Sequence, residues 1–289
     1  MKTLRYIVLC CAIVTVSAVQ AQLFWQISGN ELSQPSFIFG THHLIDKNKI
    51  NNFEEVLEKL KQVDIMIGEM KMSNMPEIQM KMMKAALMKN NTIRDLLNDE
   101  EYVLVDNELK ATVGVGLNKL GKLKPMMLSS MYSVMLYMQY HQMNKQPEAI
   151  DVIFQKSAKK QKKEVVGLET VEQQIDILFN SISLKRQAEI LVEGMRDKKE
   201  SLFEMDQLNN AYIAGDLALL ETLYLENDDM TVDENKILLD QRNDSWMKQL
   251  VEILPRKSCF IAVGCMHLVG ENGIINRLQK AGYVVEAIQ

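Results

Sequence analysis

Apolar and polar positions change their period along the chain, and these changes predict a sheet built from both ends of the sequence. Short apolar runs typical of strands occur at residues 23–28, 36–40, 63–66, 165–168, 259–263 and 283–288. The first two flank a turn-rich link that ends at Pro35, so they predict a hairpin. Helical periods at residues 52–62 and 278–281 lead into neighbouring runs, and this alternation is typical of an α/β sheet.

The interior of the chain has mainly helical periods. They occur at residues 75–89, 99–111, 124–143, 149–163, 184–214, 217–226 and 233–254. Because the strands of the two ends must meet, we expect one α/β domain over residues 22–289, with a central mixed sheet wrapped by helices and a large helical insertion. Met131, Met135 and Met138 share one face of the predicted helix 124–143 and are expected in the core.

Residues 1–21 have the pattern of a secretory signal peptide. Lys2 and Arg5 precede an apolar run at residues 6–19, and Ala21 stands at the expected cleavage point. We therefore expect an exported protein, periplasmic or secreted, that keeps no stable membrane span after cleavage. A permanent anchor is the alternative, but the run is shorter than the roughly 20 apolar residues that span a bilayer.

Charge and cysteine content narrow the class of protein. The formal net charge of -5 argues against a nucleic-acid partner, because phosphate binding needs clustered cations. Beyond the predicted signal peptide only Cys259 and Cys265 remain, and both lie in one apolar run. Six residues of strand would separate them by about 20 Å, so we expect packed thiols and no disulfide. The pattern makes no prediction of oligomeric state.

Two of the four histidines stand at matching positions after predicted strands. His43 follows Gly40 by three residues, and His267 follows Gly264 by three residues. Each glycine turns the chain where an apolar strand ends, and such strand ends bind ligands in open α/β sheets. Imidazole is a common metal ligand and a proton shuttle, although ordinary turn histidines are the alternative for each one alone.

Two glutamates also follow predicted strands. Glu69 comes directly after Gly68, and Glu169 follows Gly167 by two residues. Two imidazoles with one carboxylate suit zinc, manganese or ferrous iron, and such a metal makes hydroxide available near neutral pH. We therefore predict a metal site at His43, Glu69 and His267, with Glu169 as partner or general base. A solvated loop carboxylate is the alternative for Glu69.

Arg242 and Asn243 lie on the predicted helix that precedes the strand at residues 259–263. Arg242 can clamp a carboxylate or phosphate, or stabilise a developing oxyanion. A surface salt bridge is the alternative. The methionines at 70, 72, 80, 82 and 83 crowd the segment after Glu69; we expect them to pack, with cuprous-ion binding as an alternative.

Taken in order, these motifs resemble those of the TraB/GumN family, which includes the Tiki metalloproteases. The resemblance rests on Phe24-Trp-Gln-Ile-Ser-Gly29, Phe37-Ile-Phe-Gly-Thr-His-His43, Gly167-Leu-Glu-Thr-Val-Glu-Gln-Gln174, Ala214-Gly-Asp216, Arg242-Asn243 and Ala262-Val-Gly-Cys-Met-His-Leu-Val-Gly270. It spans about residues 23–289. It implies the erythromycin-esterase/ChaN-like fold and, by analogy with Tiki-like members, protease activity that depends on manganese or cobalt. His42 beside His43 leaves the ligand assignment open by one residue.

These observations lead to one main expectation and two alternatives. We expect an exported hydrolase, most readily a peptidase, that uses Mn, Co or Zn and acts on a polypeptide or small-molecule substrate. Arg242 and Asn243 would orient the substrate or stabilise the oxyanion, and Glu69 or Glu169 would transfer the proton. A non-catalytic envelope protein that binds haem, metal or polypeptide is the first alternative, and copper handling by the methionine-rich segment is the second.

Overall fold

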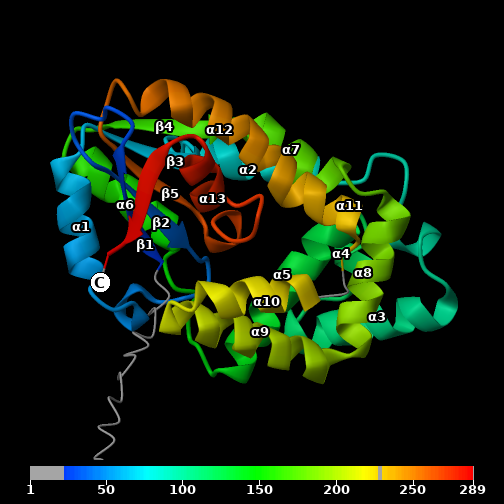
Figure 1. Ribbon diagram of the computed structural model, residues 1–289. Coiled ribbons are helices and arrows are strands. Elements are labelled where there is room, and N and C mark those ends of the chain that lie inside the picture. The colour runs from blue at the N-terminus through cyan, green and yellow to red at the C-terminus, as the bar shows by residue number, and fades with distance from the viewer. Residues whose placement is uncertain (1–22, 227–229, 289) are drawn as a thin grey trace, which may run out of the picture.

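The structure, a computed structural model, describes residues 23–226 and 230–288; the predicted signal peptide at residues 1–21 lies outside them. Six strands form one sheet in the order β4-β3-β5-β2-β1-β6 (Figure 1). In chain order they are β1 Phe24–Gly29, β2 Ser36–Thr41, β3 Ile65–Met70, β4 Glu164–Glu169, β5 Cys259–Gly264 and β6 Tyr283–Ala287.

The two ends of the chain meet in this sheet, as the sequence predicts. β1 and β2 form the predicted antiparallel hairpin, and β6 pairs with β1 on its other side. The middle of the sheet is parallel, because β5 lies between β2 and β3, and β3 also pairs with β4. The predicted α/β fold with a mixed sheet is therefore confirmed.

Helices and short helical turns connect and cover the strands. They are η1 Lys47–Lys49, α1 Phe53–Gln62, α2 Met75–Ala85, η2 Ile93–Asp95, α3 Asp99–Thr112, α4 Leu117–Leu120, α5 Pro125–Tyr140, α6 Ile150–Lys160, α7 Val171–Asn180, α8 Leu184–Arg196, α9 Lys198–Ala214, α10 Leu217–Glu226, α11 Val232–Asn235, the π-helical turn η3 Lys236–Asp240, α12 Gln241–Ile253, η4 Cys265–His267 and α13 Ile274–Lys280.

Each face of the sheet buries its own apolar layer. Alternate residues of β5 point in opposite directions, so that Phe260 packs with α1 and α6 while Ile261 packs against α12 and α13. A third apolar cluster lies in the helical insertion, where α3, α5 and α8 pack together. Figure 1 shows these helices gathered to one side of the sheet. The insertion therefore has its own core beside the two sheet cores.

The structure corrects three details of the predicted helices. The predicted helix 184–214 is two helices, because Asp197 leaves the helical conformation between α8 and α9. The break lets α8 pack in the insertion while Tyr212 of α9 packs on the sheet. Helix α7 was not predicted, although Thr170 and Gln173 form a capping box at its start. The predicted helix 233–254 contains the π-helical turn η3.

Two predictions about packing have different outcomes. Cys259 and Cys265 are buried free thiols, as expected. The methionine face predicted for the core is wrong in part, because Met135 of α5 is 38% exposed and Met131 and Met138 are half-buried. The fully buried face of α5 carries Leu128, Tyr132 and Leu136 instead. Spacing alone could not separate these two faces, since both repeat at helical period.

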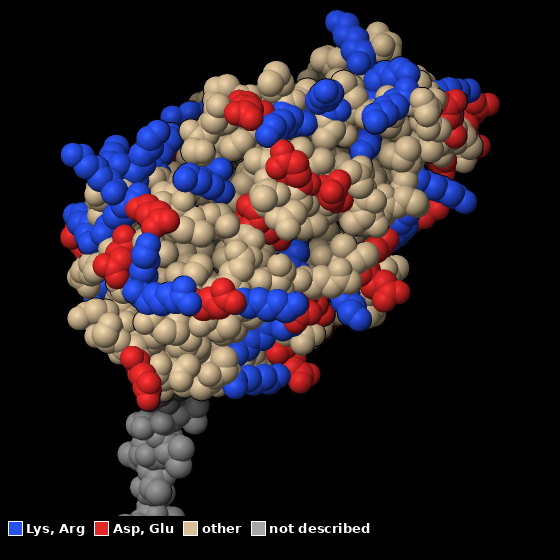
Figure 2. Space-filling model, turned by 90° about the horizontal axis from the view of Figure 1, so that it is seen from above, with Lys and Arg blue, Asp and Glu red and all other residues tan. Residues whose placement is uncertain are grey.

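Two further observations describe the surface of the protein. No helix among residues 23–226 and 230–288 is long and apolar enough to cross a membrane. Acidic and basic side chains are interspersed over the face seen in Figure 2. This face therefore offers a ligand both acidic and basic side chains.

Candidate functional site

The carboxyl ends of the four parallel strands lie side by side at one edge of the sheet. Thr41 at the end of β2 pairs with Gly264 of β5, and Met70 of β3 pairs with Glu169 of β4. The residues at or after these ends therefore meet, although Thr41 and Gly264 are more than 200 positions apart in the sequence and Met70 and Glu169 nearly 100. This is the edge at which ligands bind in open α/β sheets.

Arg242 of α12 joins the two predicted glutamates. Its Nη2 donates hydrogen bonds to Glu69 Oε2 at 2.7 Å and to Glu169 Oε2 at 2.9 Å, and its Nε donates to Glu169 Oε1 at 2.7 Å. Trp246, one turn further along α12, donates from Nε1 to Glu169 Oε1 at 2.9 Å. The guanidinium also lies 4.7 Å from the Trp246 ring centre. Arg242 is thus fixed by two carboxylates and an aromatic ring.

All five N–H groups of Arg242 have partners within the protein. Beyond the three bonds to glutamates, its Nη1 donates to Leu238 O at 3.3 Å and lies 3.0 Å from His267 Nε2. A guanidinium has five such donors. Arg242 could therefore clamp a substrate or oxyanion, as predicted for it, only by releasing one of these partners.

The bonding of His267 assigns its tautomer. Asn243 donates from its side-chain nitrogen to His267 O and Asn272 O, so its Oδ1 is the acceptor for His267 Nδ1 at 2.8 Å. The proton therefore sits on Nδ1, and Nε2 accepts from Arg242. Burial lowers the pKa of His267 to about 4, so the imidazole is neutral at physiological pH. Asn243 is buried and orients His267.

Glu69 is held as a carboxylate at the centre of this cluster. Its Oε1 accepts the backbone N–H of Gly264 at 2.7 Å, and its Oε2 accepts from Arg242 and from Gln174 of α7. Burial by itself raises the pKa of Glu69, but His267, Arg242 and the Gly264 hydrogen bond outweigh it and hold the pKa below its ordinary value. The side chain is 23% exposed, so solvent reaches it.

Two glycines have steric reasons to stand at these strand ends. A Cβ on Gly264 would lie 3.2 Å from Glu69 Oε1, which would crowd the carboxylate that this glycine binds. A Cβ on Gly40 would lie 3.0 Å from the Cβ of Cys265 and 3.0 Å from Leu268. The two glycines thus allow Glu69 and turn η4 to approach the strands closely.

His43 lies outside the Arg242 cluster and faces a different carboxylate. Its Nδ1 is 3.8 Å from Oδ1 of Asp151 in the first turn of α6, and its side chain is 70% exposed. Asp151 is buried, and its Oδ1 has no hydrogen-bond partner among the described residues. The interaction with Asp151, helped by the charge of Glu69, raises the pKa of His43 against the effect of burial.

His42 points to the opposite side of the chain from the solvent-facing His43. Its ring centre lies 5.0 Å from that of the buried Tyr212, and its Nδ1 accepts the N–H of Leu44 at 3.1 Å. Burial, and then the charge of His43, lower the pKa of His42 to about 4. His42 is therefore a neutral packing residue, and His43 is the accessible histidine of the pair.

The predicted three-ligand metal centre does not fit these contacts. His267 Nε2 and Glu69 Oε2, the two donor atoms that come together, are both bonded to Arg242, and His43 turns to Asp151. Within residues 23–226 and 230–288 no three His, Cys, Asp or Glu side chains are grouped to hold a metal ion. The guanidinium is the cation that these two donors bind, and uptake of Mn, Co or Zn stays a prediction.

Sequence reasoning missed three residues of this site. Asp151 had no distinguishing signal, because an acid in the first turn of a helix is common. Trp246 could have been found, since it stands four residues after Arg242 on the same helix face. Gln174 ends one motif of the family resemblance but was given no role in the site, and it belongs to α7, the helix that was not predicted. Copper binding by the methionines after Glu69 stays an alternative to their packing.

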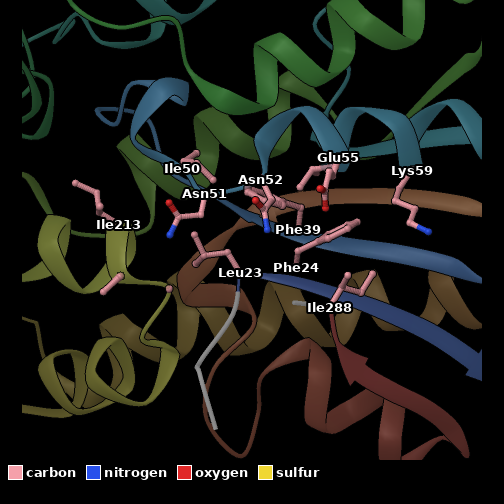
Figure 3. A pocket seen from close by; sticks show the side chains of 13 residues that line it. Leu23, Phe24, Phe39, Ile50, Asn51, Asn52, Glu55, Lys59, Ile213 and Ile288 are labelled. Atoms are coloured by element: carbon pink, nitrogen blue, oxygen red, sulfur yellow. The ribbon is translucent and has the colours of Figure 1, made fainter. Parts of the chain in front are cut away.

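A recess of about 320 Å³ opens beside the β2 end of the site (Figure 3). Phe24 and Phe39 form its apolar floor, Ile213 and Ile288 lie at its sides, and Glu55 of α1 overhangs it. The recess is close to the histidine loop, because Gly40 donates its N–H to the carbonyl of Leu23, which also lines the recess. Its volume lies at the lower end of the range of small-molecule sites, so it is large enough for an apolar side chain of a ligand.

Comparison with known proteins yields a family match. The model of the TraB/PrgY/gumN family matches residues 23–287, nearly the whole chain. No curated protein and no solved structure matches the chain.

Proposed function

Because the chain belongs to the TraB/PrgY/gumN family and gathers ionisable side chains at one sheet edge, we propose that it is a hydrolase. Its reaction would take place between the carboxyl ends of β2, β3 and β5. The substrate would be a polypeptide or a small ester or amide outside the cytoplasm, in keeping with the signal pattern of residues 1–21.

The observation that supports this proposal is the pair of His43 and Asp151. A buried carboxylate with one unsatisfied oxygen faces Nδ1 of the imidazole of His43, whose side chain is mostly exposed. A carboxylate in this place favours the tautomer with a proton on Nδ1 and stabilises the imidazolium. Nε2 of His43 is then free to accept a proton from water.

The proposed step transfers one proton and exchanges two bonds. His43 Nε2 takes a proton from water while the water oxygen bonds to the substrate carbonyl carbon. The bond from that carbon to the leaving nitrogen or oxygen then breaks, and His43 returns the proton to the leaving group. Glu69, fixed by Arg242 and Gly264, faces the same edge, and its charge favours the imidazolium formed in this step.

A bound divalent cation is the alternative to His43 as the group that activates water, and one observation favours it. His267 is neutral with an unprotonated Nε2, and its Nδ1–H is held by Asn243, the arrangement that orients metal-ligating histidines. Such an ion would need Arg242 to leave Nε2 of His267. A centre made of His43, Glu69 and His267 would also need His43 to turn away from Asp151.

Turnover of a mixed peptide and ester library tests the proposal. The purified mature protein is assayed beside Asp151→Asn, His43→Gln and His141→Gln. His141 is the matched control, because it also pairs with an aspartate: its Nε2 lies 2.7 Å from Oδ1 of Asp206. This pair is in the helical insertion, where His141 caps the end of α5. We expect His43→Gln to lose about 100-fold or more in kcat and His141→Gln to keep wild-type activity.

The same assay in the presence of a metal chelator distinguishes the His43 mechanism from the metal-dependent one. Activity that survives chelation supports the His43 base without a metal, whereas activity that returns only with Mn, Co or Zn supports the metal-dependent form. A folded protein that cleaves no member of the library contradicts the hydrolase proposal and favours the envelope binding protein. Unchanged turnover in His43→Gln refutes the assignment of the base.

A further inference from the structure

A second cavity lies in the helical insertion, away from the strand ends. It has a volume of about 230 Å³ and is enclosed by α5, α8 and α9. Its walls are mainly apolar, with Leu136 of α5, Leu191 of α8 and Leu208 of α9 among them. Spaces between packed helices are common places for small-molecule sites.

One hydroxyl in this cavity has no partner. Ser129 Oγ is inaccessible to solvent and makes no hydrogen bond with any described residue. A buried hydroxyl without a partner is unfavourable by about 1–3 kcal/mol, so such groups are usually satisfied. Ser133 stands one turn further along α5 and lines the same cavity. A ligand oxygen in the cavity could therefore bond to Ser133, and to Ser129 once a change of rotamer turns its hydroxyl towards the cavity.

A glycine in the opposite wall supports the same conclusion independently. Gly194 lies within α8, and a Cβ built on it would meet nothing within 4 Å. Glycine inside a helix is less favourable than alanine by roughly 0.5–1 kcal/mol, and no close contact in the protein requires it here. An empty space above Gly194 is explained if a bound group comes close to the helix backbone.

Charge selects the class of ligand. Among the described residues that line the cavity, Glu204 is the one charged side chain, and it already has an interaction partner in the protein. An anion would therefore meet a carboxylate and no cation, and an ammonium group would compete with the existing partner of Glu204, while a neutral molecule would meet apolar walls and serine hydroxyls. We propose that this cavity binds a small neutral amphiphile: an aliphatic chain that ends in a hydroxyl group, with its oxygen at Ser129 and its chain over Gly194.

The test measures binding of 1-hexanol, hexanoate and hexylamine to the full-length mature protein by calorimetry and ligand-observed NMR. We expect hexanol to bind more tightly than both charged analogues. Gly194→Leu should abolish binding by filling the cavity, and Ser129→Ala should weaken it about threefold to tenfold. Ser130→Ala is the matched control, because the Ser130 hydroxyl is exposed and bonds to Met126 O.

Gly194→Ala distinguishes an effect on folding from an effect on ligand binding. This change should raise the Tm of the free protein, because alanine favours the helix and its Cβ meets no atom. Failure of hexanol to bind the folded wild type would overturn the proposal and leave Ser129 with a buried water. Equal affinity for all three probes, or unchanged binding in Gly194→Leu, would overturn it as well. None of these outcomes depends on hydrolase activity.

Discussion

His43 is the titratable side chain that connects the site most directly to the proposed reaction. It is exposed, faces buried Asp151 and carries a raised pKa. Because a general base must be unprotonated, activity should rise with pH through this raised pKa. Asp151→Asn removes the main cause of the shift, so the acid limb of the pH profile of kcat/KM should move to lower pH.

The measurement for this first prediction is the kcat/KM profile of the wild type and of Asp151→Asn over the range in which histidine titrates. Asp151→Asn should also lower the maximal rate, because the imidazolium loses its carboxylate. An acid limb that stays at the same pH would refute the assignment of Asp151 as the residue that orients His43.

The second prediction concerns His267 and the stability of the folded protein at acidic pH. Its pKa is about 4 in the folded protein against an ordinary value of 6.5, so between these values the unfolded chain binds a proton that the folded chain does not. Stability should therefore fall as the pH drops from 6.5 towards 4, by on the order of 3 kcal/mol from this residue. His42 should contribute a loss of the same sign.

Urea denaturation at several pH values between about 7 and 4.5 measures this loss. His267→Gln should be less stable than wild type at neutral pH, yet its free energy of unfolding should fall less steeply on acidification. The same slope in both proteins would mean that His267 does not stay neutral in the folded state.

At the scale of elements, Arg242 ties together the ends of β3 and β4, helix α12 and turn η4. Arg242→Met would leave the carboxylates of Glu69 and Glu169 without their cation in a mostly buried place. We expect a loss of roughly 3–5 kcal/mol in the free energy of unfolding, measured by urea denaturation. Adding Glu69→Gln and Glu169→Gln to Arg242→Met should recover much of the lost stability. A loss below about 1 kcal/mol in Arg242→Met alone would show that these ion pairs contribute no more than solvent-exposed ones.

The recess between β1, α1 and the end of α9 supports a prediction about substrate choice. Ala214 is exposed at its wall, so Ala214→Trp should fold and partly fill it. If the recess holds an apolar side chain of the substrate, kcat/KM should fall about tenfold or more for peptides with leucine or phenylalanine and little for glycine peptides. Ala218→Trp, at an exposed position of α10, is the control, and an equal loss for all peptides would contradict this role.

At the scale of the whole molecule, the apolar clusters divide into two on the faces of the sheet and one in the insertion. Elements that bury separate cores often open as separate cooperative units. In native-state hydrogen exchange at low denaturant, we therefore expect amides of α3, α5 and α8 to form one group of opening free energies and those of β3 and β5 another. A single common value for both groups would show that the cores unfold as one.

Part of this molecule was determined by local sequence. The apolar runs at residues 23–28 and 36–40 flank a turn-rich link, so the β1–β2 hairpin could be predicted. The glycine-histidine spacings identified two strand ends. Glu69 and Glu169 were predicted to follow two more strands, but they lie within the last two residues of β3 and β4. The strands themselves could be predicted because hydrophobic period and turn residues act within a few positions of each other.

The tertiary structure alone decided what those residues bind. The sequence placed His43, Glu69 and His267 at one edge but could not place Arg242 between Glu69 and His267, because α12 comes from a distant part of the chain. It could not pair His43 with Asp151, and it could not show that His42 turns inward to Tyr212. Local period determines which elements form, whereas side-chain partners depend on long-range packing, which brings together residues that have no pattern in common.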